Sequence, residues 1–391
     1  MPVHNAIADQ AEDMCQWRHY LHSHPELAFQ EHKTADFIAE KLESFGVEVH
    51  RGLAGTGVVG VIRGRGDSKK MIGLRADIDA LPIHEENTFD HKSQHSGVMH
   101  ACGHDGHTAM LLGAARHLAE NRNFDGDVVV IFQPAEEDGG GGKVMLDDGL
   151  LTQFPVDTIW GMHNWPGLDV GQVMIHRGAS MAAADSFDIK LTGRGGHAAM
   201  PHETADPIYA AAALIQALQS VVSRRLNPFD AAVVSITQCH SGFTHNVIPD
   251  EAFIQGTARY FNPDLGKKIR IDMEQIINHV ASAHGCSAQF DWIDGYPPTI
   301  NDAAAAERAA LAAADVLGSG SVVMDPPPSM GAEDFSYMLD ARPGAYIWLG
   351  AGHPGDGAML HNAHFDFNDA LLPLGASYWV SLVERELGTG V

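Results

Sequence analysis

The sequence predicts an α/β protein: a mixed, largely parallel sheet with flanking helices, and a smaller α+β domain inserted into the chain. Two observations predict this class. Short apolar runs bounded by glycine alternate with helical patterns in the first part of the chain, which is typical of a largely parallel sheet. The pattern then changes to the order β-α-β-β-α-β, which is typical of an antiparallel split βαβ sheet. A chain of 391 residues has room for both domains.

The larger domain is predicted to comprise residues 1–182 and 296–391, on either side of the insertion. Its elements are recognised by helical periodicity or by short apolar runs. The expected helices cover residues 6–22, 31–45, 302–317 and 370–387, and the expected strands cover 58–62, 71–74, 127–132, 158–162, 321–324 and 345–349.

The inserted domain is predicted at residues 183–295, where strand-like alternation begins. About 110 residues is an ordinary domain size. The expected strands are 186–191, 231–238, 251–260 and 287–293, and the expected helices are 206–225 and 263–284.

Composition excludes several classes of partner. The chain has 50 acidic and 25 basic side chains and a formal charge of -25, which argues against binding to nucleic acid or to anionic membranes. No apolar run reaches the 18 residues of a membrane span, and the N-terminus lacks the pattern of a secretory signal. The four cysteines show no paired spacing, so we expect free thiols and a cytoplasmic protein.

The segment from Met99 to His107 carries the strongest chemical signal. One cysteine and three histidines fall between His100 and His107, and these are the side chains that bind borderline-soft metals. We expect Gly103 and Gly106 to let the backbone fold tightly enough for the side chains to converge. The apolar run that follows has helical spacing, so the cluster should lie in a loop that opens a helix.

Polar residues follow the predicted strands. Asp77 and Asp79 come after the strand at 71–74, Glu136 and Glu137 after the strand at 127–132, and His163 after the strand at 158–162. Ligands of open α/β sheets bind at the carboxyl ends of the strands, so these groups should share one site. Neighbouring carboxylates point in different directions, so one can bind metal while the other transfers protons.

Five motifs resemble the aminoacylase/hippurate hydrolase branch of the aminoacylase–carboxypeptidase metallohydrolases, which includes the indole-acetyl-amino-acid hydrolases. They lie at residues 75–82, 99–107, 133–137, 193–202 and 331–335. The resemblance implies two divalent metal ions per subunit and an inserted lid domain that also dimerises. It implies that the metal ligands are Cys102, His104, Glu137, His163 and His361. It also implies Glu136 as general base and Asp77 as the carboxylate that orients a ligand.

The expected reaction is hydrolysis of the amide bond of N-acyl-amino acids by a metal-bridged hydroxide, with Glu136 moving the proton. Mixed sulfur, nitrogen and oxygen ligands suit Mn, Zn, Co and Ni alike. A dipeptidase or exopeptidase on the same scaffold and a non-catalytic metal-binding relative are the alternatives. A further alternative makes Cys102 a nucleophile with His104 or His107 as its base.

The resemblance extends to the inserted domain. It implies that His197 reaches the active site of a partner subunit in a homodimer or higher homo-oligomer, and that Asn246 and Arg259 bind substrate. Gly331, in the predicted larger domain, is expected to join the substrate site by giving backbone access there. Arg259 could hold a carboxylate in a bidentate fork or form a structural salt bridge. Some branches of the superfamily have a metal-binding histidine where this chain has Arg75, which cannot ligate a cation.

Overall fold

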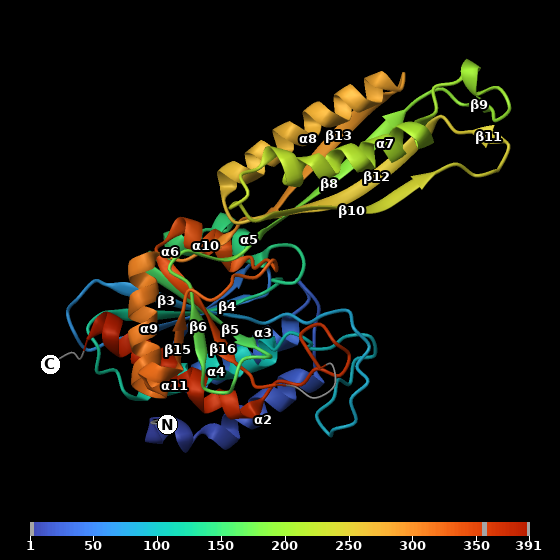
Figure 1. Cartoon of the computed structure of the whole chain (residues 1–391). Coiled ribbons are helices and arrows are strands. Elements are labelled where there is room, and N and C mark those ends of the chain that lie inside the picture. The colour runs from blue at the N-terminus through green and yellow to red at the C-terminus, as the bar shows by residue number, and fades with distance from the viewer. Residues whose placement is uncertain (1–3, 354–357, 389–391) are drawn as a thin grey trace. The chain divides into compact units, whose positions relative to one another are not determined.

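The computed structural model describes residues 4–353 and 358–388, which divide into two compact units (Figure 1). The first unit comprises Met1–Ser180, Ile300–Pro328 and Asp334–Val391. The second comprises Met181–Thr299 and the short segment Ser329–Glu333. None of the helices in the described part is long and apolar enough to cross a membrane.

An eight-stranded sheet in the order β1-β2-β4-β3-β5-β16-β6-β15 forms the centre of the first unit. The pairs β4–β3, β3–β5, β5–β16 and β6–β15 are parallel, and the others are antiparallel. This mixed, largely parallel sheet confirms the predicted fold class. Its strands are β1 (Glu48–Leu53), β2 (Gly57–Arg63), β3 (Met71–Asp77), β4 (Asp127–Gln133), β5 (Thr158–Trp165), β6 (Val173–Ile175), β15 (Val322–Met324) and β16 (Gly344–Gly350).

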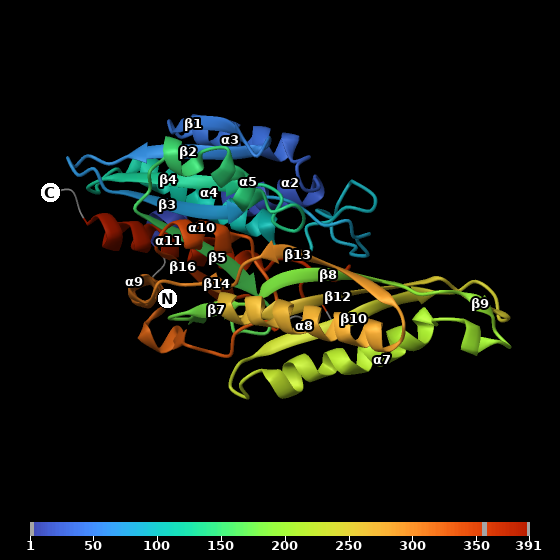
Figure 2. The same cartoon turned by 90° about the horizontal axis from the view of Figure 1, so that it is seen from above.

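The sequence did not predict the edge strand β1, which Figure 2 shows beside β2 at one side of this sheet. Every residue of β1 is exposed or only partly buried, so it lacks the apolar run by which its buried neighbours were recognised. An edge strand needs no such run because one face and one side meet solvent.

Helices cover both faces of the large sheet. Helices α2, α3, α4, α9 and α11 share one apolar core with β2, β3 and β4, and α4 lies at its centre with no fully exposed residue except its last, Glu120. The shorter α5 and α10 contact each other and the strands β4 and β5. These helices are α1 (Asn5–Ala8), α2 (Ala11–Ser23), α3 (His32–Ser44), α4 (His104–Glu120), α5 (Gly141–Asp147), α6 (Leu150–Gln153), α9 (Ala303–Leu317), α10 (Phe335–Ala341) and α11 (Leu372–Leu387).

The second unit is an antiparallel sheet in the order β10-β12-β8-β13 with two helices that share its apolar core. Strand β8 alternates buried and half-buried residues, because one face packs on the helices. The elements follow the chain as β8 (Ala183–Thr192), β9 (Gly196–His197), α7 (Pro207–Ser220), β10 (Ala232–Ser241), β11 (Val247–Ile248), β12 (Glu251–Tyr260), α8 (Pro263–Ala283) and β13 (Ser287–Tyr296). The predicted helix at 206–225 ends earlier, because a π-helical turn replaces its last five residues.

Candidate metal centre

The loop before α4 presents Cys102, and His104 is the first residue of that helix. Between them Gly103 has a φ of 101°, a left-handed conformation that favours glycine, and a Cβ there would lie 2.3 Å from Asn164 Oδ1. Gly106 is different, since it lies inside the helix, and a Cβ would meet the ring of Phe367 at 2.3 Å. The turn therefore depends on Gly103, whereas Gly106 is required by close packing and not by the turn we expected.

All five expected metal ligands lie in the first unit and converge. Cys102, His104 and His163 form one group whose ligand atoms lie within 4.8 Å of one another, and Cys102, Glu137 and His361 form a second. Glu136 joins His104 and Glu137 in a third such group. Cys102 is common to the first two groups, so its sulfur could be shared by two ions.

Hydrogen bonds leave one nitrogen of each buried histidine available as a ligand. Nδ1 of His163 donates to its neighbour's carbonyl, Asn164 O, at 2.6 Å, and Nδ1 of His104 donates to the carbonyl of Asp79 at 3.0 Å. In the neutral form of each ring, the lone pair therefore sits on Nε2. His163 Nε2 lies 3.3 Å from Cys102 Sγ, and His104 Nε2 is buried without a hydrogen-bond partner among the described residues. An orphaned buried nitrogen facing a thiol and carboxylates fits a metal ligand.

Asp79 holds two of the converging residues at once. One carboxylate oxygen accepts from His104 Nδ1 at 3.1 Å, and the other accepts from the backbone N–H of Glu137 at 2.9 Å. The side chain is buried, so both bonds are shielded from water. Asp79 therefore fixes the ring of one ligand and the backbone of another.

Asp77, for which we expected the orienting role, has other hydrogen-bond partners. It accepts from His107 Nδ1 at 2.6 Å and from the guanidinium of Arg75 at 2.7 Å, and it lies 3.8 Å from His104 Nε2. Arg75 also donates to Asp334 at 3.0 Å, so one buried cation joins two buried carboxylates. This pairing explains why an arginine is tolerated beside the centre.

The electrostatics favour a cation. Although burial alone would lower it, the carboxylates of Asp77, Asp79 and Glu137 raise the pKa of His104 to about 10. Burial keeps the pKa of His163 well below its usual range, so that ring is neutral. Burial, then the charges of Glu137 and Glu136, raise the pKa of the Cys102 thiol. A thiol surrounded by carboxylates is a poor nucleophile by itself, but a divalent cation would stabilise its thiolate.

One buried network behind the cluster was not predicted. Arg18 and His22 of α2 both bind Asp105, the residue after His104, at 2.9 and 2.8 Å. All three side chains are fully buried. Three polar residues on two amphipathic helices gave no sequence signal, because nothing in their spacing shows that they meet. His107 lies three residues after His104, and that helical spacing could have indicated its place at the site.

The three residues predicted in the inserted domain lie in the second unit. Gly331, which we placed in the larger domain, lies there too, in the segment Ser329–Glu333. His197 is exposed in β9, which pairs with β11, and the carbonyl of Asn246 accepts from Ala198 N at 3.1 Å. Gly331 accepts from Ala182 N at 3.0 Å. Arg259 is half-buried and forms no salt bridge with a described residue, which disfavours the alternative of a structural salt bridge. Burial lowers the pKa of its guanidinium.

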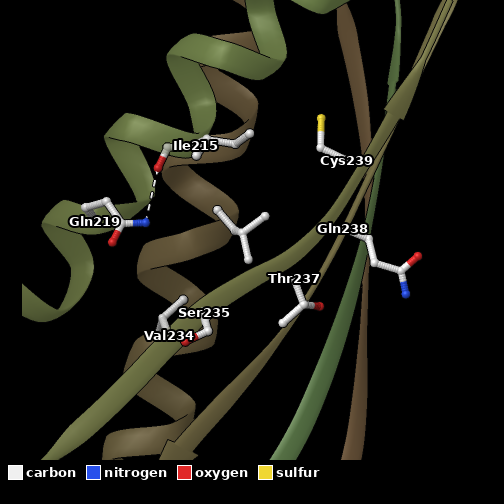
Figure 3. A pocket seen from close by; sticks show the side chains of 8 residues that line it. Ile215, Gln219, Val234, Ser235, Thr237, Gln238 and Cys239 are labelled. Atoms are coloured by element: carbon white, nitrogen blue, oxygen red, sulfur yellow. Dashed lines mark hydrogen bonds between the residues drawn. The ribbon is translucent and has the colours of Figure 1, made fainter.

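Two other features lie apart from the centre. Cys15, His19 and Asp369 cluster in the first unit, but Asp369 already faces the buried cation Arg18 at 3.4 Å, so we assign no metal there. A hollow of about 470 Å³ lies between α7 and β10 in the second unit (Figure 3). The side chains labelled in the figure, among them Ile215, Gln219 and Cys239, include both apolar and polar groups. Of these labelled groups, only the thiol of Cys239 is a strong metal donor.

Residues 73–385 match the model of peptidase family M20/M25/M40. The chain belongs to this family. The match spans most of the first unit, the whole of the second unit and every expected metal ligand. It confirms the family resemblance that the five motifs indicated.

Named relatives lie close in sequence. The hippurate hydrolase of Campylobacter jejuni is 41% identical over 370 residues, which cover 95% of each chain. An N-acyl-L-amino acid amidohydrolase of Geobacillus stearothermophilus is 45% identical over 302 residues, covering 76% of this chain and 80% of the relative. Among solved structures, a Bacillus subtilis protein named a dinuclear metal-binding peptidase of the M20 family has a TM-score of 0.86 and 35% identity, with 98% and 99% of the two chains covered.

Proposed function

We propose that this protein is a metal-dependent amidohydrolase that cleaves N-acyl-amino acids into a carboxylic acid and a free amino acid. One observation carries the proposal: five metal-type donors converge in the first unit together with a further carboxylate, Glu136. A site that only bound metal would not need that carboxylate. The names of the hippurate hydrolase and amidohydrolase relatives support the same substrate class.

Two divalent ions fit the donor set. His104 and His163 would hold one, Glu137 and His361 the other, and Cys102 would serve both. The ligands suit Zn, Mn, Co or Ni. When bound, such ions polarise the amide carbonyl and make an attacking water more acidic.

The protein's own residues then move protons and hold the geometry. Glu136 is buried, and it would take the proton from the attacking water and return it to the leaving nitrogen. Asp79 keeps His104 in the tautomer with a free Nε2. Asp77, bonded to His107 and Arg75, holds a negative charge behind the centre.

The second unit would supply substrate contacts. Arg259 forms no salt bridge with a described residue, so its guanidinium would be available to bind a substrate carboxylate, together with Asn246 and Gly331. The four-stranded sheet of this unit has two edges, β10 and β13. An edge strand exposes unpaired backbone N–H and C=O groups that can pair with another chain. A two-fold dimer formed through one of these edges would pair those groups. His197 would then act on the substrate carbonyl in the partner's site.

All four cysteines are free, in keeping with a cytoplasmic location.

The test is a substrate panel crossed with a metal panel. Metal-free protein is loaded with Mn²⁺, Zn²⁺, Co²⁺ or Ni²⁺ and assayed for amine release from N-acetyl- and N-benzoyl-amino acids, their methyl esters and dipeptides. The kcat/KM of the free acids should exceed that of the esters. The ratio should correspond to about 2–3 kcal/mol of transition-state stabilisation, the scale of a charge-assisted hydrogen bond. Equal values for acid and ester would contradict carboxylate recognition. Faster cleavage of dipeptides would make the protein a dipeptidase instead.

A further inference from the structure

The turn after β4 carries both Glu136 and Glu137, and its backbone is strained. Ala135 has a φ of 55°, a left-handed conformation that residues with a Cβ rarely adopt. The residue is fully buried and is not glycine. Such a conformation persists only where its surroundings hold it.

The side chain of Glu31 contacts this turn from the start of α3. One carboxylate oxygen accepts from the backbone N–H of Ala135 at 2.9 Å, and the other accepts from Thr56 Oγ1 at 2.6 Å. Glu31 is fully buried, and that burial raises its pKa. A buried carboxyl group is costly unless it makes strong hydrogen bonds, and here one of its two bonds goes to the strained residue.

Two separate carboxylates therefore anchor the two sides of Glu136. Glu31 binds the amide that precedes it, and Asp79 binds the amide of Glu137 that follows it. The carbonyl of Ala135 is held as well, since it accepts from Gly141 N at 2.9 Å. Removal of Glu31 would take away the anchor at the amide of Ala135. The anchor of Glu137 and the bond from Gly141 N to the carbonyl of Ala135 would remain.

We propose that Glu31 is a positioning residue that holds Ala135 in its left-handed conformation and thereby aims Glu136 at the reacting water. This inference rests on the proposed function, in which Glu136 is the general base. Glu31 does not touch the reacting atoms. It acts through the backbone of the turn.

The first variant is Glu31→Ala, which leaves the buried amide of Ala135 without its acceptor. We expect kcat to fall about 10–100-fold, the usual effect of losing an outer partner of a metal site. KM should stay near the wild-type value. The metal content of the holoenzyme, measured by mass spectrometry, should stay near wild type as well, because Asp79 still holds Glu137. Amide hydrogen exchange of a peptide covering residues 133–137 should become faster.

A conservative variant separates positioning from general stability. In Glu31→Gln the amide oxygen can still accept from Ala135 N, and the amide nitrogen can donate to Thr56 Oγ1. Most of kcat and the slow exchange should therefore return. If Glu31→Ala does not fold, Thr56→Val is used in its place. Loss of the Thr56 hydroxyl removes the hydrogen bond that holds one carboxylate oxygen of Glu31. We then expect a several-fold fall in kcat at unchanged metal content.

The matched control is Glu26→Ala. Glu26 also anchors the start of α3, where it accepts from Thr34 N at 2.9 Å and Thr34 Oγ1 at 3.0 Å, but it does not bind the turn. This variant should lose stability without the fall in kcat.

The outcomes distinguish the two proposals. An inactive wild type with every metal and substrate would end the proposed function, while hydrogen exchange would still test whether Glu31 holds the turn. With an active wild type, equal kcat in Glu31→Ala and Glu26→Ala would overturn the positioning role. Loss of metal from Glu31→Ala would overturn it too, because Glu31 would then support the ligands rather than the base.

Discussion

Replacing Asp79 by asparagine should weaken metal binding at His104, although residue 79 is not itself a ligand. The aspartate uses both oxygens as acceptors, one for His104 Nδ1 and one for the backbone N–H of Glu137. Asparagine has one acceptor oxygen and one NH₂ donor. If its oxygen takes the Glu137 amide, its NH₂ faces His104 Nδ1. The carbonyl of Asp79 still accepts from Nδ1, but the new donor competes with that bond and favours moving the proton to Nε2, the nitrogen that should bind metal.

The expected loss follows from the number of interactions changed. An outer partner of a metal ligand contributes about 10–100-fold in affinity, or about 1.4–2.7 kcal/mol. The bond from Nδ1 to the backbone carbonyl of Asp79 remains, so we expect the lower part of this range. The assay is competition with a chelator of known affinity, together with metal content after dialysis.

The control is Asp147→Asn, which removes an exposed carboxylate paired with Lys143 on α5. Surface pairs of this kind contribute little, so metal affinity should not change. Unchanged affinity in Asp79→Asn, with a folded protein, would refute the reasoning that Asp79 sets the His104 tautomer.

Three further predictions concern other parts of the molecule. Although burial alone would lower it, Asp105 and Glu85 raise the pKa of His22 to about 9, above its value of about 6.5 in an unfolded chain. This stabilisation is complete below about pH 6.5 and is lost as the pH rises through about 9, so the Tm of the wild type should fall over that interval. The fall should be steeper than in His22→Gln, and equal slopes of Tm against pH would contradict this prediction. Mixing inactive His197→Ala with inactive Glu136→Gln should restore part of the activity if subunits exchange, and exchange without recovery would exclude action across a dimer. Cys102→Ala should lose metal and activity, and full activity in that variant after chelation would contradict the shared thiolate.

The sequence could predict the large sheet and the converging ligands because both leave local signals. Buried strands such as β3 and β4 are continuous apolar runs, and acids and histidines follow them where parallel strands end. The Cys102–His104 segment carries its own glycine turn. The edge strand β1 lacks an apolar run and could not be recognised in that way.

The supporting groups could not be predicted, because their chemistry depends on contacts between distant residues. Glu31 lies 104 positions from Ala135, and Arg18 lies 87 positions from Asp105. Each is an ordinary polar residue in its own helix region, and only the folded chain shows that it is buried. Likewise, the strand pattern does not separate Asp77 from Asp79, and only the resemblance singled out Asp77, whereas the structure gives the two residues different partners.

The central claim is that Glu137 holds metal while its neighbour Glu136 moves protons, and one paired measurement tests it most directly. Glu136→Gln and Glu137→Gln are purified side by side, and metal content and turnover are measured on the same samples. The account predicts that Glu136→Gln keeps its metal and loses turnover by several orders of magnitude, since an amide cannot carry the proton. It predicts that Glu137→Gln loses metal. The reverse pattern, with metal lost from Glu136→Gln and retained in Glu137→Gln, would contradict it.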